Sequence, residues 1–495
     1  MPPSPHPGSP AEPLAARERL AVLFDEPGFH ETFQFARHAA LLPGRLPAEA
    51  SSDELVSGRG LVEGRLAYAS SHAGPFLEGT RGWIQARAVC GIMDLALKAH
   101  APFVWMSGAG APDRRALGAA LRDYARVFHY NALLGGSVPQ IAVITGPADG
   151  LAFVPSLTDF VIATASVRRV AVAGAEILAD EIAAGPQERS PRGGDVHIVA
   201  GSDTEAVLAA RRLLSYVAPP ADAAGWEAAR PAAVAPPDDG VLQGLRPTAQ
   251  RYDMAEVLHR IADRGSIFAV HRHYAPGLIT AFARFDGEPA ALVANQPAVG
   301  DGALTAEAAD KASRFVRFCN AHGIPLVSVV DVPGFAPLGA GAGPRSVTRH
   351  AARMLFAFSA ANVPKITVIV GRAYGGAYLA MSAKSLGADR VAAWPMADIR
   401  LVPAERDLGA MLRREAEGGT DAPPASGGGR DRTSPYAAAA AGVVDAVIEP
   451  ARTRAYIIAA LASLRSRDRT GTLAIPATPA RTMFAGRAAT AGVLS

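Results

Sequence analysis

The chain carries one strand-and-turn segment twice, and this repeat limits what it can fold into. Residues 138–152 read VPQIAVITGPADGLA, and residues 363–377 read VPKITVIVGRAYGGA. At a constant offset of 225, nine of the fifteen positions are identical, including a proline and two glycines in register. Chance supplies matches between apolar strands, but it does not supply Pro and Gly at matching positions. The sequence therefore predicts a duplicated domain.

The two halves of the chain show the same order of expected elements. Each has an extended segment, a helix-period stretch, a short apolar strand, a second helix and then the repeated segment. The first three are 64–73, 81–101 and 103–110 in one half and 288–297, 306–323 and 324–334 in the other. Strands that alternate with helices and read as short apolar runs indicate parallel pairing in an α/β fold.

Composition places the boundary between the halves. Residues 218–239 are dense in Ala and Pro without an apolar period, as expected for an interdomain linker. We expect an N-terminal domain at 14–217, a linker at 218–240, a C-terminal domain at 241–467 and a tail at 468–495.

The bulk numbers exclude several classes. Hydrophobic residues make up 49% of the 495-residue chain, and its formal net charge is only +3. Neither value suggests nucleic acid or a membrane surface as a partner. Cys90 and Cys319 stand far apart in apolar contexts, so we expect buried thiols rather than a disulfide or a metal site. The Pro-rich N-terminus does not resemble a signal peptide, and the expected location is the cytoplasm.

The second copy of the repeat has the chemistry of an anion site. Gly375 and Gly376 allow backbone angles that a Cβ would forbid, and a helix-like stretch comes after them. The free N–H groups at a helix start favour negative charge, which is how a backbone builds an oxyanion hole. A glycine turn needed only for tight packing is the alternative. The recurrence of the turn in both halves favours two sites.

Several longer motifs point to one family. They include ARERLAVLFDEPGF (16–29), MDLALKAHAP (93–102) and NVPKITVIVGRAYGGAYLAMSAK (362–384). The chain resembles the carboxyltransferase (β) subunits of biotin-dependent acyl-CoA carboxylases, the propionyl-CoA and acetyl-CoA carboxylase group, from about Ala15 to Arg467. The resemblance implies two crotonase-like domains related by a pseudo-twofold. It also implies an oligomer, from dimer to hexamer, in which the N half of one subunit faces the C half of another.

The resemblance also implies where the chemistry takes place. In that family one oxyanion hole holds the acyl thioester carbonyl as it becomes an enolate, and the other holds the ureido carbonyl of carboxybiotin. Carried over, the catalytic backbone amides are those of Gly150, Leu151 and Ala152 in the N half and Gly375, Gly376 and Ala377 in the C half. The substrate-binding residues implied are Ser107, Gly108, Ala109, Gly110, Asp149, Tyr374 and Leu379. No tightly bound cofactor is expected; biotin would come on a separate, biotinylated α subunit.

Departures from the family pattern cluster on the acyl side. The usual Gly-Pro-Cys-Ala-Gly-Gly-Ala turn is Gly-Pro-Ala-Asp-Gly-Leu-Ala at 146–152, and the usual Ser-Gly-Gly-Ala-Arg loop is altered at 107–111. An Asp that influences acyl choice is replaced by Leu379. The C-half turn is therefore better kept than the acyl side, although neutral drift in a working carboxylase would also give this pattern.

This uneven pattern leaves three hypotheses. The favoured one is biotin-independent decarboxylation of a β-keto or malonyl-type acid or thioester, as is thought of paralogues near polyketide and other secondary-metabolic pathways. The second is a carboxyltransferase subunit of a biotin-dependent acyl-CoA carboxylase. The third is a non-catalytic subunit of a hetero-oligomeric carboxylase.

Overall fold

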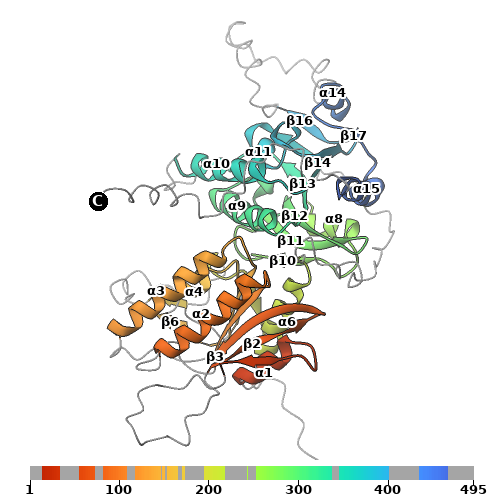
Figure 1. Ribbon diagram of the computed structural model, residues 1–495. Helices are drawn as coiled ribbons and strands as arrows, with labels where there is room; N and C mark the ends of the chain where they lie inside the picture. Colours follow the sequence, from red (N-terminus) through yellow and green to blue (C-terminus); the bar gives the residue numbers. More distant parts are fainter. Residues whose placement is uncertain are drawn as a thin grey trace, which may run out of the picture. The chain divides into compact units, whose positions relative to one another are not determined.

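The computed structural model divides the chain into two compact units, with the boundary between Ala229 and Arg230 (Figure 1). It describes residues 14–33, 55–72, 82–108, 117–146, 148–150, 153–165, 170–172, 194–217, 242, 252–336, 345–400 and 434–465. The expected linker at 218–240 and tail at 468–495 lie outside these residues. Because each unit is described by itself, the pseudo-twofold between the halves stays a prediction.

Unit 1 is built on one sheet whose strand order is β1-β2-β3-β4-β5-β7-β9. The first three strands pair antiparallel, and every later pair in this sheet is parallel. The strands are β1 (His30–Thr32), β2 (Leu55–Val62), β3 (Arg65–His72), β4 (Phe103–Ser107), β5 (Gln140–Ile144), β7 (Phe160–Thr164) and β9 (Ile198–Ala200). A separate parallel pair joins β6 (Ala148–Gly150) to β8 (Val170–Val172).

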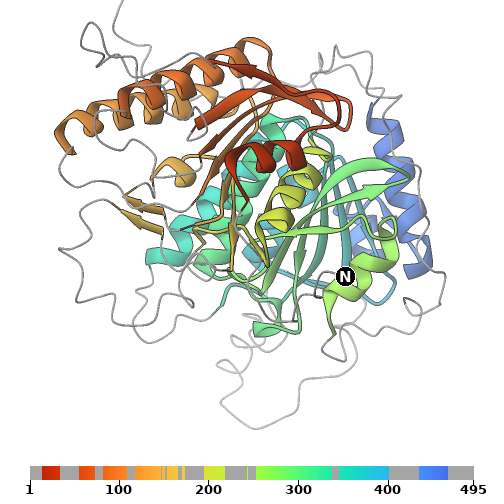
Figure 2. The ribbon, with the colours of Figure 1, turned by 90° about the horizontal axis from the view of Figure 1, so that it is seen from below.

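Helices cover both faces of this sheet. The unit has α1 (Ala16–Leu23), α2 (Gly82–Lys98), α3 (Leu117–Leu134), α4 (Phe153–Ser156) and α6 (Asp203–Leu214). One buried cluster joins α2 and α3 to Phe103 and Trp105 of β4. Since side chains alternate along a strand, Val104 and Met106 face the opposite side, where α1 packs beside α6 (Figure 2).

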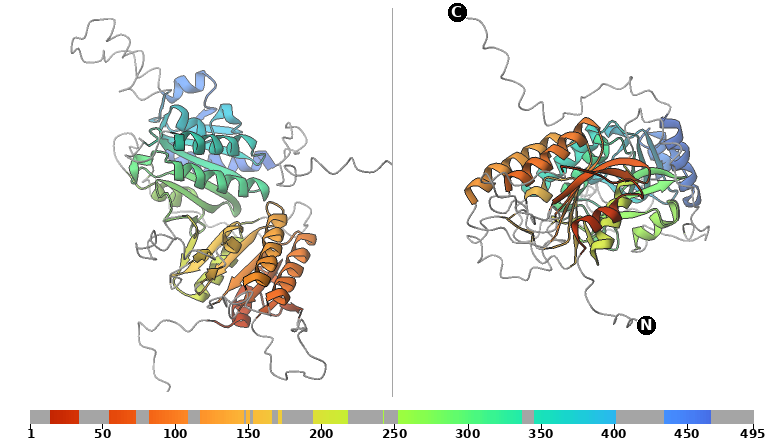
Figure 3. Two further views of the ribbon diagram at one scale, coloured as in Figure 1. Left: turned by 90° about the vertical axis from the view of Figure 1, so that its left-hand side faces the viewer. Right: turned by 60° about the horizontal axis from the view of Figure 1, so that its bottom comes forward.

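Unit 2 repeats this plan, with strand order β10-β11-β12-β13-β14-β15-β17 and β16 paired to β14. The strands are β10 (Phe268–Val270), β11 (Leu278–Phe285), β12 (Glu288–Asn295), β13 (Leu326–Val332), β14 (Lys365–Tyr374), β15 (Arg390–Ala393), β16 (Asp398–Arg400) and β17 (Ala446–Val447). The helices are α8 (Met254–Ile261), α9 (Ala306–Ala321), α10 (Arg345–Ala360), α11 (Gly375–Ala380), α14 (Pro435–Ala440) and α15 (Thr453–Arg465). Helices α9 and α10 lie side by side (Figure 3), as α2 and α3 do in unit 1.

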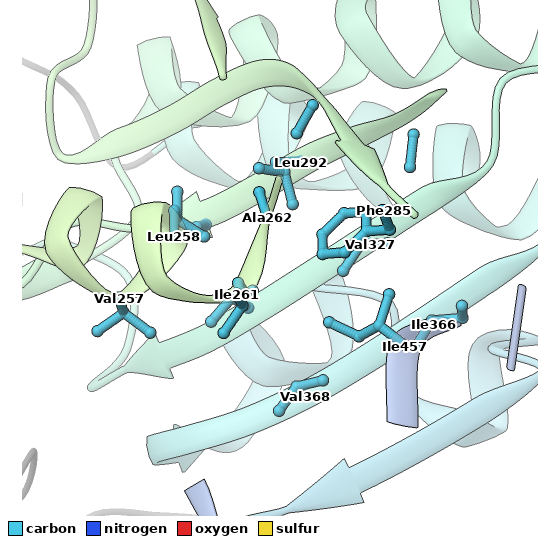
Figure 4. Close-up of a cluster of buried hydrophobic side chains, with 14 of the residues drawn as sticks. Val257, Leu258, Ile261, Ala262, Phe285, Leu292, Val327, Ile366, Val368 and Ile457 are labelled. Atoms are coloured by element: carbon cyan, nitrogen blue, oxygen red, sulfur yellow. The ribbon is translucent and has the colours of Figure 1, made fainter. Parts of the chain in front are cut away.

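One buried cluster of unit 2 lies between the sheet and helices α8 and α15. Val257, Leu258 and Ile261 of α8 belong to this buried cluster with Phe285 of β11 and Ile457 of α15 (Figure 4). Helix α8 begins where the Asp253 carboxylate accepts the backbone N–H of Ala255. The cap and the apolar spacing together place one buried face against the sheet.

The duplication extends to single hydrogen bonds. Gln140 pairs with Phe103 in unit 1, and Lys365 pairs with Leu326 in unit 2. At the start of β5 the N–H of Gln140 donates to the Asp159 carboxylate at 2.8 Å. At the start of β14 the N–H of Lys365 donates to the Asp389 carboxylate at the same distance. The predicted domain duplication is therefore confirmed at the level of register.

A second repeated contact ties α6 to the end of α1 in unit 1 and α15 to the end of α8 in unit 2. Arg211 donates to the Asp25 carboxylate at 2.7 Å and to the Leu23 carbonyl at 2.6 Å. Arg454 donates to the Asp263 carboxylate at 2.5 Å and to a carbonyl in α8 at 3.1 Å. The two pairs differ mainly in burial, because the side chain of Asp25 is 31% exposed and that of Asp263 only 5%.

This difference predicts unequal costs for the same substitution. Arg454→Met leaves a buried carboxylate without its cation, and we expect it to lower the unfolding free energy of unit 2 by about 3–5 kcal/mol. Arg211→Met exposes Asp25 to water, and we expect a loss of about 1 kcal/mol in unit 1. Urea denaturation followed by peptide-level hydrogen exchange measures both units; equal losses would contradict the prediction.

Two further findings concern the described residues alone. Cys90 and Cys319 are both free and buried, as expected. No helix in the described ranges combines the length and apolar character needed to cross a bilayer.

Candidate functional site

The C-half turn lies where β14 ends and α11 begins. Gly375 has a φ of +54°, in the left-handed region that favours glycine. Tyr374 occupies the position before the helix, and its side chain makes no capping hydrogen bond to the first turn. The N–H groups at the start of α11 therefore have no partner from this cap. Gly376 is exposed, and a Cβ built on it would come no nearer than 3.6 Å to the ring of Phe335.

The hydroxyl of Tyr374 is held away from that turn. It donates to the Asp398 carboxylate at 2.6 Å, and Arg400 makes an ion pair with the same carboxylate. The guanidinium carbon of Arg400 lies 5.4 Å from the centre of the Tyr374 ring. Burial, with the hydrogen bond to Asp398, raises the pKa of Tyr374 well above its usual value. Tyr374 therefore contributes a fixed, neutral side chain beside the turn.

A buried ion pair lies just before the turn. Asp331 of β13 accepts hydrogen bonds from the backbone N–H and the Nε of Arg372, at 3.0 and 2.7 Å. It also accepts a bond from the Tyr252 hydroxyl at 3.1 Å. Nη1 of Arg372 donates to the Asp301 carboxylate at 2.6 Å. Arg372 thus has the salt-bridged role that such residues usually have.

The pKa values of this network are set by burial and charge. Burial raises the pKa of Asp331 above its ordinary value, and Arg372 acts against that rise. Burial alone would lower the pKa of Arg372. The hydrogen bond to Asp301 and the charge of Asp331 outweigh burial, so the pKa of Arg372 lies above its ordinary value. All three partners of Asp331 are donors, which is the arrangement that an ionised carboxylate requires.

The helix-like stretch after the turn forms only a short helix. It ends at Ala380, and Ser382 has a φ of +66°, outside the helical region. Ala377 and Tyr378 are buried, whereas Leu379 is 39% exposed. Burial raises the pKa of Tyr378 to about 12. Leu379 therefore presents an apolar surface at the position where the family pattern has an acid.

The N-half turn is described only in part. Asp149 and Gly150 lie in β6, which pairs with β8 as the end of β14 pairs with β16. Leu151 and Ala152 lie outside the described residues. So the backbone strand that leads into this turn is in place, but the predicted N-half oxyanion hole stays a prediction.

Ser107 and Gly108 lie at the carboxyl end of β4, close to β5. Ser107 is buried; its hydroxyl donates to the Gly108 carbonyl at 3.3 Å, and its carbonyl accepts the N–H of Thr145 at 2.9 Å. The N–H of Gly108 donates to the His72 carbonyl at 2.9 Å. Ala109 and Gly110 lie outside the described residues. The structure thus gives Ser107 and Gly108 packing roles, and their substrate contacts stay predicted.

Two residues near the turns were not predicted from the sequence. His72 ends β3 beside Ser107, and burial, together with the charge of Arg19, lowers the pKa of its imidazole to about 3. Asp331 is the other; its only signal was an acid within the apolar run LVSVVDV. Among the described residues, no group of three or more His, Cys, Asp or Glu side chains could hold a metal ion.

Comparison with known proteins gives one consistent result. The carboxyl transferase domain model matches residues 9–474. The methylmalonyl-CoA decarboxylase subunit alpha of Veillonella parvula is 37% identical, over 92% of this chain and 90% of its own length. The methylmalonyl-CoA carboxyltransferase 12S subunit of Propionibacterium freudenreichii subsp. shermanii is 38% identical, over 92% and 89%.

The comparison with solved structures points to the same family as the sequence relatives. A crystal structure of transcarboxylase 12S, described as a hexamer assembly with methylmalonyl-coenzyme A bound, superposes with a TM-score of 0.80 and 35% identity. The superposition covers 93% of this chain and 91% of that one. Both units accordingly have the crotonase-like carboxyltransferase fold. The chain belongs to the carboxyl transferase domain family, and it is an enzyme of carboxyl-group chemistry.

Proposed function

We propose that this enzyme moves a carboxyl group on or off the α-carbon of an acyl-CoA of the propionyl and methylmalonyl type. We further propose that the group passes to or from biotin on a separate subunit. The relatives carry the names methylmalonyl-CoA decarboxylase, methylmalonyl-CoA carboxyltransferase and propionyl-CoA carboxylase beta chain. A methylmalonyl thioester is a propionyl thioester with one added carboxyl group, so a single thioester pair accounts for all three names.

The observation that carries this proposal is the C-half turn. Its first helical N–H groups have no cap from Tyr374, and exposed Gly376 has no Cβ to cover them. A flat carbonyl can approach such a backbone, and N–H groups aimed at its oxygen stabilise the charge that develops there. The ureido carbonyl of biotin is a flat carbonyl of this kind. Biotin, when bound, would carry the carboxyl group on its ureido ring.

The reaction at the substrate balances through an enolate. When the bond from the α-carbon to the carboxyl group breaks, its electron pair moves toward the thioester carbonyl and gives an enolate oxygen. Backbone N–H groups of a turn, here those around Gly150–Ala152, stabilise that oxygen. When the carboxyl group leaves, the enolate carbon would take a proton from the ureido nitrogen of biotin, and the CO2 would pass to that nitrogen. In the reverse direction the ureido nitrogen, freed when carboxybiotin releases CO2, would take the α-proton of the acyl thioester, and the enolate would add to the CO2. No side-chain base is then required in either direction.

Biotin-independent decarboxylation, favoured by the altered acyl-side residues, remains the second candidate function. Its supporting observation is the exposed apolar side chain of Leu379 beside the turn. An apolar surface removes water from a substrate carboxylate, which promotes loss of CO2. The intact C-half turn weighs against it, because simple decarboxylation needs one oxyanion hole rather than two.

One pair of assays separates the two candidates. The purified protein alone is tested for CO2 release from methylmalonyl-CoA, malonyl-CoA and a β-keto acid. In parallel it is tested for carboxylation of propionyl-CoA with a biotinylated α subunit, ATP and bicarbonate. Activity only with the biotinylated subunit supports carboxyl transfer. Release of CO2 by the protein alone supports the second candidate, and inactivity in both assays would contradict both candidates.

We also propose that the active form is an oligomer, between a dimer and a hexamer. Transcarboxylase 12S is described as a hexamer, and the two turns lie in different halves of this chain. Light scattering at micromolar concentration measures the assembly. A stable monomer would remove the expected pairing of an N-half turn with a C-half turn from another subunit.

A further inference from the structure

The strand that leads to the C-half turn leaves the regular register of its sheet. Val330 of β13 pairs with Ile369 of β14, but the next pair is Val332 with Ala373. Three residues of β14 therefore stand opposite the single residue Asp331. Such a bulge bends a strand and re-aims the residues that come after it. Regular pairing resumes at Ala373, two residues before Gly375.

The carboxylate of Asp331 fills this bulge. Its side chain is 0% exposed, and it accepts the backbone N–H of Arg372, which has no regular partner on β13 there. A Cβ on Gly371 would lie 2.6 Å from the carboxylate carbon of Asp331. Only glycine at 371 leaves room for the carboxylate against the β14 backbone. The Asp331 carboxylate thus accepts the backbone N–H that a regular β-sheet hydrogen bond to β13 would otherwise satisfy.

The side chain of Arg372 fixes the same strand to a second loop. Besides the ion pair with the Asp301 carboxylate, its Nη2 donates to the Asp301 carbonyl at 3.0 Å. Asp301 lies in the 3₁₀ turn Gly300–Gly302, whose Gly302 carbonyl accepts a hydrogen bond from the Asn295 amide at 3.1 Å. The guanidinium of Arg372 in β14 therefore binds Asp331 of β13 directly, and it reaches the end of β12 through the Gly300–Gly302 turn.

Unit 1 has no counterpart of this device among its described residues. The matched registers place Gly108 where unit 2 has Asp331. At the sequence offset of 225, Arg372 aligns with Pro147, which lies outside the described residues. Proline has no N–H, so that position needs no carboxylate to satisfy it. The ion pair is thus a specific feature of the C-half turn rather than a requirement of the shared fold.

We propose that Asp331 and Arg372 are positioning residues that hold the bulge of β14 and thereby aim the backbone N–H groups of Gly375–Ala377. The proposal rests on the proposed function in one respect: those N–H groups stabilise an anion during carboxyl transfer. Neither side chain touches the substrate; each acts through the backbone of β14. Because the bulge is held by charge as well as by shape, neutral replacements should loosen the turn while the sheet stays folded.

The test compares four single variants of the full-length protein, one of which, Arg372→Lys, keeps the positive charge at its position. Asp331→Asn keeps the shape of the side chain but removes its charge. Arg372→Gln keeps the backbone hydrogen bond but removes the guanidinium, and it serves if Asp331→Asn does not fold. The matched control is Asp389→Asn, because Asp389 also accepts a backbone N–H of β14, at the opposite end of the strand.

Two readouts are measured on each variant. Peptide-level hydrogen exchange over residues 373–380 is expected to rise about tenfold or more in Asp331→Asn and Arg372→Gln, and to stay at the wild-type rate in Asp389→Asn. Steady-state kinetics should show kcat lowered by about tenfold or more with KM within about threefold, because only the transition state depends on the aimed N–H groups. Arg372→Lys should recover part of both losses.

The outcomes separate positioning from the proposed function. Wild-type exchange at 373–380 in both Asp331→Asn and Arg372→Gln, or an equal rise in Asp389→Asn, overturns the positioning role. If wild-type protein shows no activity in any assay, the proposed function fails. The exchange comparison still decides whether these residues hold the turn.

Discussion

Replacing Gly376 by Pro should lower kcat about 100- to 1,000-fold, the usual cost of losing one oxyanion-hole donor. Gly376 is the second residue of α11, a position in the first helical turn where proline can be accommodated. The substitution therefore removes one N–H group from the turn with limited change to the helix. The measurement is kcat in the assay that gives activity, with the oligomer checked by light scattering.

The matched control for this variant is Gly376→Ala. Its Cβ would meet the ring of Phe335 at 3.6 Å, an ordinary contact, and its N–H group is kept. We expect a loss in kcat of less than about tenfold, since the donor remains. Equal losses in the Pro and Ala variants would show that the space at Gly376 matters and the N–H group does not.

Acidification should destabilise unit 1 through His72. The pKa of its buried imidazole is about 3 in the folded chain, against an ordinary value of 6.5. Below pH 6.5 the unfolded chain therefore binds a proton that the folded chain does not. The stabilisation is fully present above pH 6.5 and is lost as pH falls toward 3, by about 1.4 kcal/mol for each pH unit. At pH 4.5 the expected loss is about 3 kcal/mol.

A pair of variants isolates this contribution. His72→Asn places at this position the residue that the matched register has at Asn295 in unit 2, and it removes the titrating group. His100→Asn replaces an exposed histidine of the same unit and serves as the control. Urea denaturation at pH 7 and pH 4.5, read by hydrogen exchange in β3 and β4, gives the difference. A pH dependence that is the same in His72→Asn as in wild type would contradict the assignment.

The sequence was sufficient for features that depend on short-range pattern. The repeat at 138–152 and 363–377 predicted two similar α/β domains, and the matched pairs of Gln140 and Lys365 with Asp159 and Asp389 confirm that duplication. Glycine at 375 predicted a turn with unusual backbone angles, and its φ of +54° bears this out. Glycine, proline and apolar period act through the local backbone, so one sequence is enough to read them.

The surroundings of the turn were decided by tertiary structure. Tyr252, Asp301, Asp331 and Arg372 come from four separate segments, and no spacing in the sequence links them. Parallel strands bring their carboxyl ends to one edge whatever the length of chain between them. The bulge in β14 is a matter of register, which is set by the pairing of β13 and β14 and not by either strand alone. For that reason the partners of Arg372, and their effect on the turn, came only from the fold.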